Sequence, residues 1–363
     1  MKYKWKEKEL LKGLKKAIQH ESIETIENYE FMLSVLKDIN TSDLPRVNND
    51  FNSLYEHYID NVDCIEDRIF DYVADMFRIC NNDDELFEQY ITPKMDLTNK
   101  ELIDLGYEII KTLDDKQAKE IYKEITNHHN HLLHIVDDEK PEEDSLIYGT
   151  ALRDYVDVKP YILLKRRHTV HDIETFIHEI MHSIIFILNN NKIYPFNYFE
   201  ELEGRFGEKL TSTYLREHKM KKEADQIDAY NLTTTLYQSY MLYLCDVLFF
   251  TAKNKTFDLE AANKMIIDET PYKDTYISPD NIRHIMEHNA FYIITNAIDY
   301  MVSLELSNKF EPKDQFSFIK RLSNMESYGF YNEDMARTFD FYKDNNKQLI
   351  DEKQRLDKVK KIS

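Results

Sequence analysis

The chain has few glycines, prolines and cysteines for its length. Its 363 residues include six glycines, eight prolines and three cysteines. Phosphate-binding loops and dinucleotide-binding fingerprints need clustered glycines, because their backbone turns tightly and approaches the ligand closely, whereas the glycines here are scattered. All-β folds need many turns, which so few glycines and prolines do not readily supply. The composition argues against both classes and favours a mostly α protein.

Paired cysteines and positive charge are also scarce. Cys64, Cys80 and Cys245 are too few and too scattered for a disulfide framework or a cysteine zinc site. Lys and Arg number 47 against 67 Asp and Glu, which gives a formal net charge of −20. An acidic protein repels the phosphate backbone of nucleic acids. We therefore expect no nucleic-acid partner.

The chain lacks a long apolar run. The best one, residues 241–252, is interrupted by Asp246 and is shorter than the roughly 20 residues of a membrane span. Seven lysines occur by Lys16, but no apolar region of the kind found in signal peptides follows them. We expect a cytoplasmic protein with no membrane partner, and the sequence contains no feature that indicates its oligomeric state.

An acidic segment divides the sequence. Residues 137–144 read DDEKPEED and hold six acids around a proline, a composition typical of a solvated linker. We predict an N-terminal helical region over 1–136, an acidic linker over 137–149 and a second region over 150–363.

The pattern of apolar residues predicts helices on both sides of this linker. Thr98 and Glu101 form the sequence signature of a capping box, which predicts a helix from there through Ile110. The one convincing strand is Lys159–Arg166, which is apolar and too short for a helix. Helical periodicity then predicts helices over 170–189, 199–219, 222–252, 258–268, 279–308 and 313–323, with a helical tail from 332.

The most informative motif is an HExxH sequence formed by His178, Glu179 and His182. Residues four apart share one face of a helix, so both imidazoles can bind the same metal ion. Glu179 lies beside them and can take a proton from a metal-activated water. The flanking residues are apolar on nearly all sides, and buried polar groups of this kind are costly unless they are paired or bound to metal. The motif therefore predicts a zinc site in the second region.

A third ligand has to come from elsewhere in the chain. Ile185 and Leu188 stand where the metzincin extension requires Gly and His, which excludes that class. The next predicted helix is strongly acidic and carries Glu200, Glu201, Glu203 and Glu208. A glutamate from this helix would complete a site with two histidines and one glutamate, which leaves a position open for water.

Residues 160–208 resemble the thimet oligopeptidase and oligoendopeptidase F family of zinc peptidases. The resemblance is carried by the strand Pro160–Leu164, the run from Asp172 to His182, and the segment Tyr198–Gly204. The resemblance implies that His178 and His182 are ligands and that Glu179 is the general base. It places the third ligand on Glu201, with Glu200 and Glu203 as competitors, because the intervening loop is a few residues shorter than is usual in the family.

The resemblance extends to a later segment in which a histidine precedes an aromatic pair. Family members use such residues to stabilise the oxyanion, which implies this role for His284 and Tyr292, with His288 in an unassigned role. The chain departs from the family pattern at Ile294 and Asn296, where further tyrosines are usual. The chain is also well short of typical members.

The resemblance and the motif together imply a mostly α zincin-type fold with a short strand beside the active-site helix and a deep substrate cleft. The expected function is zinc-dependent hydrolysis of short unstructured peptides, with one zinc ion per chain and Glu179 as general base. The Lys159–Arg166 strand could align the peptide as an added strand. The alternatives are a non-catalytic, zinc-stabilised helical protein that binds peptides, and a zinc hydrolase of a non-peptide amide.

A second histidine cluster spans His128–His134. Helical spacing would place His131 and His134 on one face. No acid lies among them, so we expect a solvated helix end, with adventitious metal binding as the alternative.

Overall fold

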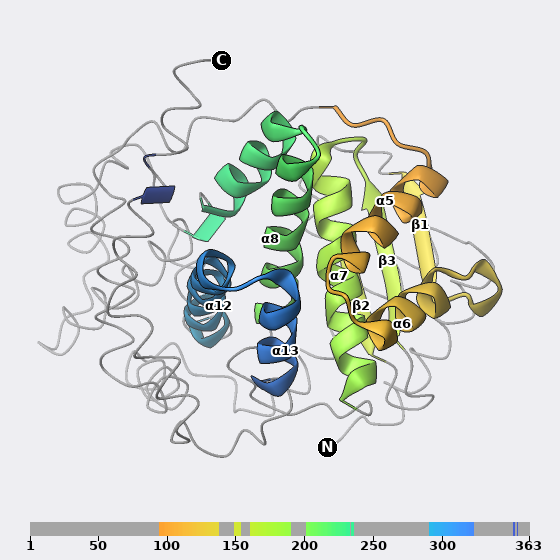
Figure 1. The fold of residues 1–363 in the computed structure, drawn as a ribbon. Coiled ribbons are helices and arrows are strands. Elements are labelled where there is room, and N and C mark those ends of the chain that lie inside the picture. The colour runs from red at the N-terminus through yellow and green to blue at the C-terminus, as the bar shows by residue number, and fades with distance from the viewer. Residues whose placement is uncertain are drawn as a thin grey trace, which may run out of the picture.

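A computed structural model describes residues 94–137, 149–153, 160–189, 201–232, 234–235, 290–322, 351–352 and 354 (Figure 1). The predicted helix over 258–268 and nearly all of the predicted tail from 332 lie outside the described residues. Among the described residues, no helix combines the length and apolar character needed to cross a membrane.

The first two described helices begin at their own caps. Helix α5 (Asn99–Lys111) starts after Thr98, whose hydroxyl accepts a hydrogen bond from the Glu101 backbone while the Glu101 carboxylate accepts one from the Thr98 N–H. Helix α6 (Lys116–Thr126) starts after Asp115, whose carboxylate caps it in a similar way. The predicted capping box is therefore confirmed, and it satisfies backbone donors that a helix start otherwise leaves unpaired.

Three strands form one mixed sheet. Strand β3 (Pro160–Arg166) is central, with β1 (Leu133–Asp137) parallel on one side and β2 (Gly149–Arg153) antiparallel on the other. The predicted strand is thus confirmed, whereas β1 and β2 were not predicted. Because both edges of β3 are already paired, the expectation that a peptide adds to this strand is wrong, and an added strand would have to pair with β1 or β2.

The sheet joins residues on the two sides of the acidic segment. Strand β1 ends at Asp137, where the acidic segment begins. It pairs with β3, which lies after the acidic segment in the chain. The division of the chain at residues 137–149 stays a prediction.

The second histidine cluster, His128–His134, does not form the helix end that we predicted. His128–Asn130 form one turn of 3-10 helix, and His131 then adopts a left-handed backbone with φ of 51°. His134 lies in β1, where hydrogen bonding to β3 sets its position. The expectation that His131 and His134 share a helical face is therefore wrong, because α6 ends at Thr126 and the chain turns into the sheet.

Helix α7 (Val170–Leu188) is the central helix of the described fold. It packs against β2, β3, α5 and α6, and also against α8 (Leu202–Glu217). This position explains why a helix that is apolar on nearly all sides is buried along almost its whole length.

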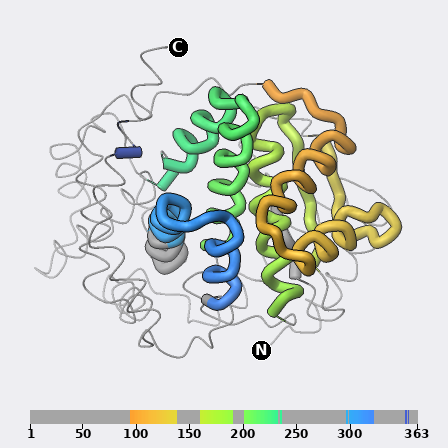
Figure 2. Tube along the Cα trace, viewed as in Figure 1, coloured from red at the N-terminus to blue at the C-terminus, as the bar shows by residue number. Residues whose placement is uncertain are grey.

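Helix α8 lies between α7 and the C-terminal helices (Figures 1 and 2). Helix α12 (Ala290–Lys309) and α13 (Pro312–Leu322) both pack against α8, and α12 makes the more extensive contact. A further helical segment, 221–232, follows α8 in the chain. The described fold is mostly helical with a short strand beside α7, as predicted.

Candidate metal centre

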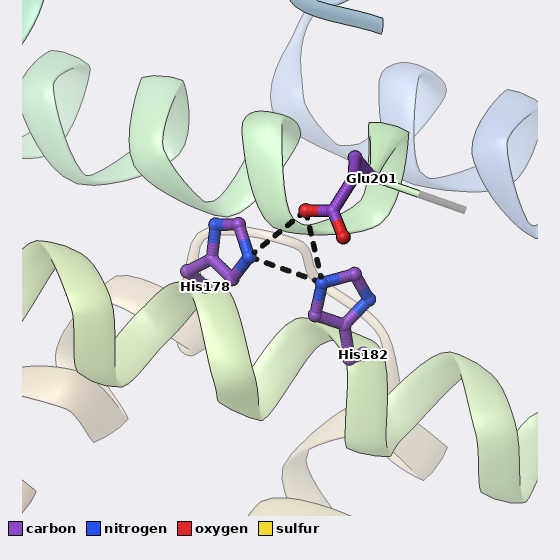
Figure 3. Close-up of side chains that lie close together, drawn as sticks. All are labelled: His178, His182 and Glu201. Carbon is purple, nitrogen blue, oxygen red and sulfur yellow. Dashed lines mark hydrogen bonds and ion pairs between the residues drawn. The ribbon is translucent and has the colours of Figure 1, made fainter. Parts of the chain in front are cut away.

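Two imidazoles and a carboxylate converge between α7 and α8. His178 and His182 project from α7 toward Glu201, the residue that precedes α8 (Figure 3). The two Nε2 atoms lie 3.1 Å apart, and Oε2 of Glu201 lies 3.4 Å from Nε2 of His178 and 3.8 Å from Nε2 of His182. All three candidate donor atoms lie within 4.8 Å of one another. These residues could hold one metal ion.

Glycines on α8 allow this close approach. A Cβ atom at Gly204 would lie 2.2–2.5 Å from three atoms of the His178 ring, and one at Gly207 would lie 2.9 Å from the carbonyl oxygen of Ile177. Side chains at either position would therefore push α8 away from α7. Gly204 and Gly207, two of the six glycines in the chain, therefore lie where α8 contacts α7 beside the histidines.

The opposite nitrogens of the two imidazoles are held by other carboxylates. Glu208 lies 2.8 Å from Nδ1 of His178, and Glu203 lies 3.2 Å from Nδ1 of His182. A carboxylate on one ring nitrogen fixes the ring and leaves the other nitrogen available, an arrangement common around metal-binding histidines. Here it leaves both Nε2 atoms on the side of Glu201.

This arrangement separates the roles of the competing glutamates. Glu203 lies on the Nδ1 side of His182, away from the position where the Nε2 atoms meet, whereas Glu201 faces both Nε2 atoms. Glu200 lies outside the described residues. Of the two described candidates, Glu201 is the one whose carboxylate could share a metal ion with both histidines.

Burial and hydrogen bonding act in opposite directions on the pKa values here. Burial tends to lower the pKa of both imidazoles, but hydrogen bonds to Glu201 and Glu208 raise the pKa of His178 well above its usual range. Those to Glu201 and Glu203 outweigh burial at His182 and raise its pKa to about 9. Burial acts to raise the pKa of Glu201, and the two imidazoles hold it well below its usual range. The acids thus favour positive charge where the Nε2 atoms meet.

An arginine links this group to α12. Arg205 Nη1 donates to Oε2 of Glu208 at 2.9 Å, and Arg205 Nε donates to Oδ1 of Asn296 at 2.8 Å. Burial raises the pKa of Glu208, but Arg205 and His178 together hold it below its usual value. The contact of Glu208 with His178 was not predicted from the sequence, although the position of Glu208 seven residues after Glu201 places both on one face of α8.

A buried aspartate on α12 contacts the start of α8. Asp299 is fully buried, and its Oδ2 accepts a hydrogen bond of 3.1 Å from the backbone N–H of Glu201. Burial first, and then the charge of Glu201, raise the pKa of Asp299 well above its usual value. No local pattern in the sequence pointed to this residue, because the contact spans 98 positions.

Acids on α7 differ in what they contact. Asp172 accepts hydrogen bonds from the backbone N–H groups of Arg167 and His168, at 2.9 and 2.8 Å, and so fixes the connection between β3 and α7. Glu174 pairs with His171, which lies three residues earlier on the same helix. Glu179 follows His178 directly and is 8% exposed, as expected for an acid beside an enclosed metal position.

The residues predicted to stabilise the oxyanion lie wholly or partly outside the described residues. His284 and His288 lie outside the described residues, and Tyr292 lies in α12 with a side chain that also falls outside them. Their roles stay predictions. Asn296, where the resemblance expects a tyrosine, is 3% exposed and bonded to Arg205.

Three solved structures that share this fold are described as peptidases. No protein-family model and no curated protein matches the sequence. PZ peptidase A, solved with an inhibitor, has a TM-score of 0.55 at 13% identity over 97% of this chain. An oligoendopeptidase F structure has a TM-score of 0.53 at 13% identity over 96%. A protein described as a peptidase from Chlamydophila abortus has a TM-score of 0.50 at 16% identity over 90%.

These matches show a shared fold. The chain spans 61% of the Chlamydophila abortus protein and 66% of each of the other two. The fold implied by the sequence resemblance to oligoendopeptidase F is therefore confirmed.

Proposed function

We propose that this protein is a zinc-dependent peptidase that hydrolyses short, unstructured peptides. The observation that carries the proposal is the convergence of His178, His182 and Glu201 beside the buried Glu179. The same fold occurs in peptidases of known structure, which supports this reading of the site.

The donor set fits zinc. Two imidazole nitrogens and one carboxylate oxygen form a ligand set found in catalytic zinc sites, and such a set leaves one coordination position open. The carboxylates of Glu203 and Glu208 on the Nδ1 atoms are the supporting partners that such histidines require. When bound, zinc would acidify a water molecule and polarise a peptide carbonyl.

Glu179 is the proposed general base. Its carboxylate takes a proton as water attacks the scissile carbonyl, and then passes the proton to the leaving amine. His284 or Tyr292 donates a hydrogen bond to the oxyanion that develops on the carbonyl oxygen. Both assignments derive from the HExxH motif and the family resemblance.

The enclosure of the site sets the proposed substrate class. The side chains of His178 and Glu201 are only 17% and 19% exposed, so the reacting carbonyl has to reach a recessed position. An extended peptide can do so, whereas a stable folded protein would first have to unfold locally. We therefore expect cleavage of unstructured peptides and none of well-folded substrates.

The test is cleavage of a mixed peptide library with and without a zinc chelator. Wild type should cleave, and chelation should abolish cleavage until zinc is returned. Glu179→Gln keeps the side-chain volume but cannot accept the proton, so cleavage should fall by several orders of magnitude with zinc content and melting temperature retained. Glu174→Gln is the matched control, because Glu174 is a buried acid on the same helix that pairs with His171, and it should keep its activity.

The same experiment separates the alternatives. A zinc-stabilised binding protein would take up zinc and melt at a higher temperature without cleaving any peptide. A hydrolase of other amides would cleave small amide substrates in a Glu179-dependent way and leave the peptide library intact. Near wild-type cleavage by Glu179→Gln would show that the proposed mechanism is wrong.

A further inference from the structure

Helix α8 begins without a cap of its own. Glu201 occupies the N-cap position, but its side chain makes no capping hydrogen bond and is turned to the histidines instead. In a capping box the third helical residue supplies a carboxylate to the N-cap backbone N–H. That residue is Gly204, and any side chain there would collide with the His178 ring. The geometry of the metal centre therefore removes both capping side chains from α8.

Helix α12 supplies the missing acceptor. Oδ2 of Asp299 lies 3.1 Å from the backbone nitrogen of Glu201 and accepts its N–H. This is the contact that Glu101 makes within α5, where its carboxylate accepts the N–H of Thr98 at 2.8 Å. In α8 the same contact comes from a residue on another helix.

The contact belongs to a row of polar residues on α12. Asn296, Asp299 and Ser303 recur at helical spacing, and each bonds to α8. Asn296 accepts from Arg205 Nε at 2.8 Å, and Ser303 Oγ donates to the Arg205 carbonyl at 3.1 Å. Arg205 in turn holds Glu208. The row therefore contacts the backbone of Glu201 directly and the carboxylate of Glu208 through Arg205.

We propose that Asp299 is a positioning residue for the metal centre, which accepts the backbone N–H of Glu201 from α12 and thereby holds the backbone from which the Glu201 carboxylate reaches His178 and His182. Asn296 supports the same centre through Arg205 and Glu208. The inference rests on the proposed function in one respect, namely that a metal ion binds at this site.

The test compares two substitutions that both keep a side chain branched at Cγ. Asp299→Asn keeps a side-chain oxygen that can accept the Glu201 N–H, whereas Asp299→Leu removes it. Zinc affinity is measured by competition with a chromogenic chelator, and the visible absorption spectrum of the Co²⁺-substituted protein reports the ligand geometry. We expect Asp299→Leu to lose about 10–100-fold in zinc affinity, as for other residues that support a metal ligand, and to change the Co²⁺ spectrum. Asp299→Asn should retain most of the affinity.

Glu305 provides the matched control. It is also a buried acid on α12, 2% exposed, and it pairs with Lys309 of its own helix. Glu305→Leu and Glu305→Gln should change the melting temperature without changing the zinc affinity or the Co²⁺ spectrum. If Asp299 served only in helix packing, the two Asp299 variants would change the melting temperature but not the zinc affinity or the Co²⁺ spectrum, as the two Glu305 variants should.

Each outcome decides the inference. Wild-type zinc affinity in a folded Asp299→Leu variant would overturn it while leaving the proposed function intact. If that variant does not fold, the smaller Asp299→Ala replaces it, and unchanged zinc affinity and Co²⁺ spectrum in that variant would overturn the inference equally. A wild-type protein that binds neither zinc nor Co²⁺ would overturn the proposed function as well.

Discussion

Two groups of buried acids lie along α8 and are neutralised in different ways. At its C-terminal end, Asp225 and Asp228 contact Lys209 and Arg216, which we call the lysine–arginine cluster. Arg216 lies 2.7 Å from each aspartate, and Lys209 lies 3.0 Å from Asp228.

At the N-terminal end of α8 the acids face imidazoles, and Arg205 contacts Glu208 as well. Glu201, Glu203 and Glu208 all contact His178 or His182, which together we call the histidine cluster. An imidazole, unlike lysine or arginine, readily gives up a proton and binds a metal ion through the freed nitrogen. The lysine–arginine cluster therefore has the composition of a structural ion-pair network, whereas the histidine cluster can exchange protons for a metal ion.

The largest expected effect comes from removing the glutamate that faces both Nε2 atoms. Glu201→Ala should lower zinc occupancy far more than Glu203→Ala, because Glu203 contacts only an Nδ1 atom. Loss of such a supporting partner costs about 10–100-fold in metal affinity, and loss of a ligand should exceed that. Metal analysis after dialysis measures the difference, and a crystal structure with Glu200 or Glu203 on the metal would contradict the assignment.

Substitutions of the predicted oxyanion donors should change rate without changing metal content. His284→Ala and Tyr292→Phe should each lower kcat by about 10²–10³-fold, the usual effect of removing one such donor. Zinc occupancy should match wild type, in contrast to substitutions within the histidine cluster. Side chains more than about 10 Å from the metal in a ligand-bound structure would exclude this role.

Breaking the lysine–arginine cluster should affect stability alone. Arg216→Met removes one cation from two buried aspartates, and we expect the free energy of unfolding to fall by about 1–3 kcal/mol, less than for a fully buried pair because Arg216 is 31% exposed. Denaturant unfolding with and without chelator measures this. Adding chelator should lower the free energy of unfolding by the same amount in wild type and in the variant. If chelator lowers it only in wild type, the two clusters are coupled.

The smallest expected effect concerns the long-range electrostatic field that the net negative charge of the protein produces. With a net charge of −20, the protein should prefer peptides carrying Lys or Arg, in kcat/KM rather than kcat. Raising ionic strength toward about 1 M shortens the screening length to about 3 Å and should weaken this preference several-fold. A preference that is insensitive to salt would point to a direct contact instead.

Local patterns in the sequence predicted the local parts of the structure. The capping box placed the start of α5, a short apolar run placed β3, and apolar periodicity placed α7 within one residue of its observed end. The boundaries of the predicted helices over 199–219 and 313–323 were also close to those of α8 and α13. All of these depend on interactions between residues a few positions apart.

Predictions failed where long-range pairing decided the outcome. His134 was expected on a helix, but β1 forms because its backbone pairs with β3. For the same reason β3 is a central strand and cannot accept a substrate strand. Strand pairing of this kind joins segments that are separated in the chain, so no local period reports it.

The sequence by itself determined that His178 and His182 share one face of a buried helix with Glu179 beside them, because the helical period fixes the relation of residues four apart. Only the tertiary structure decided which glutamate faces both Nε2 atoms, since Glu201 and Glu203 differ by two positions and diverge only when α8 packs on α7. It also decided that Asp299 caps α8, through a contact across 98 residues that depends on how α12 docks.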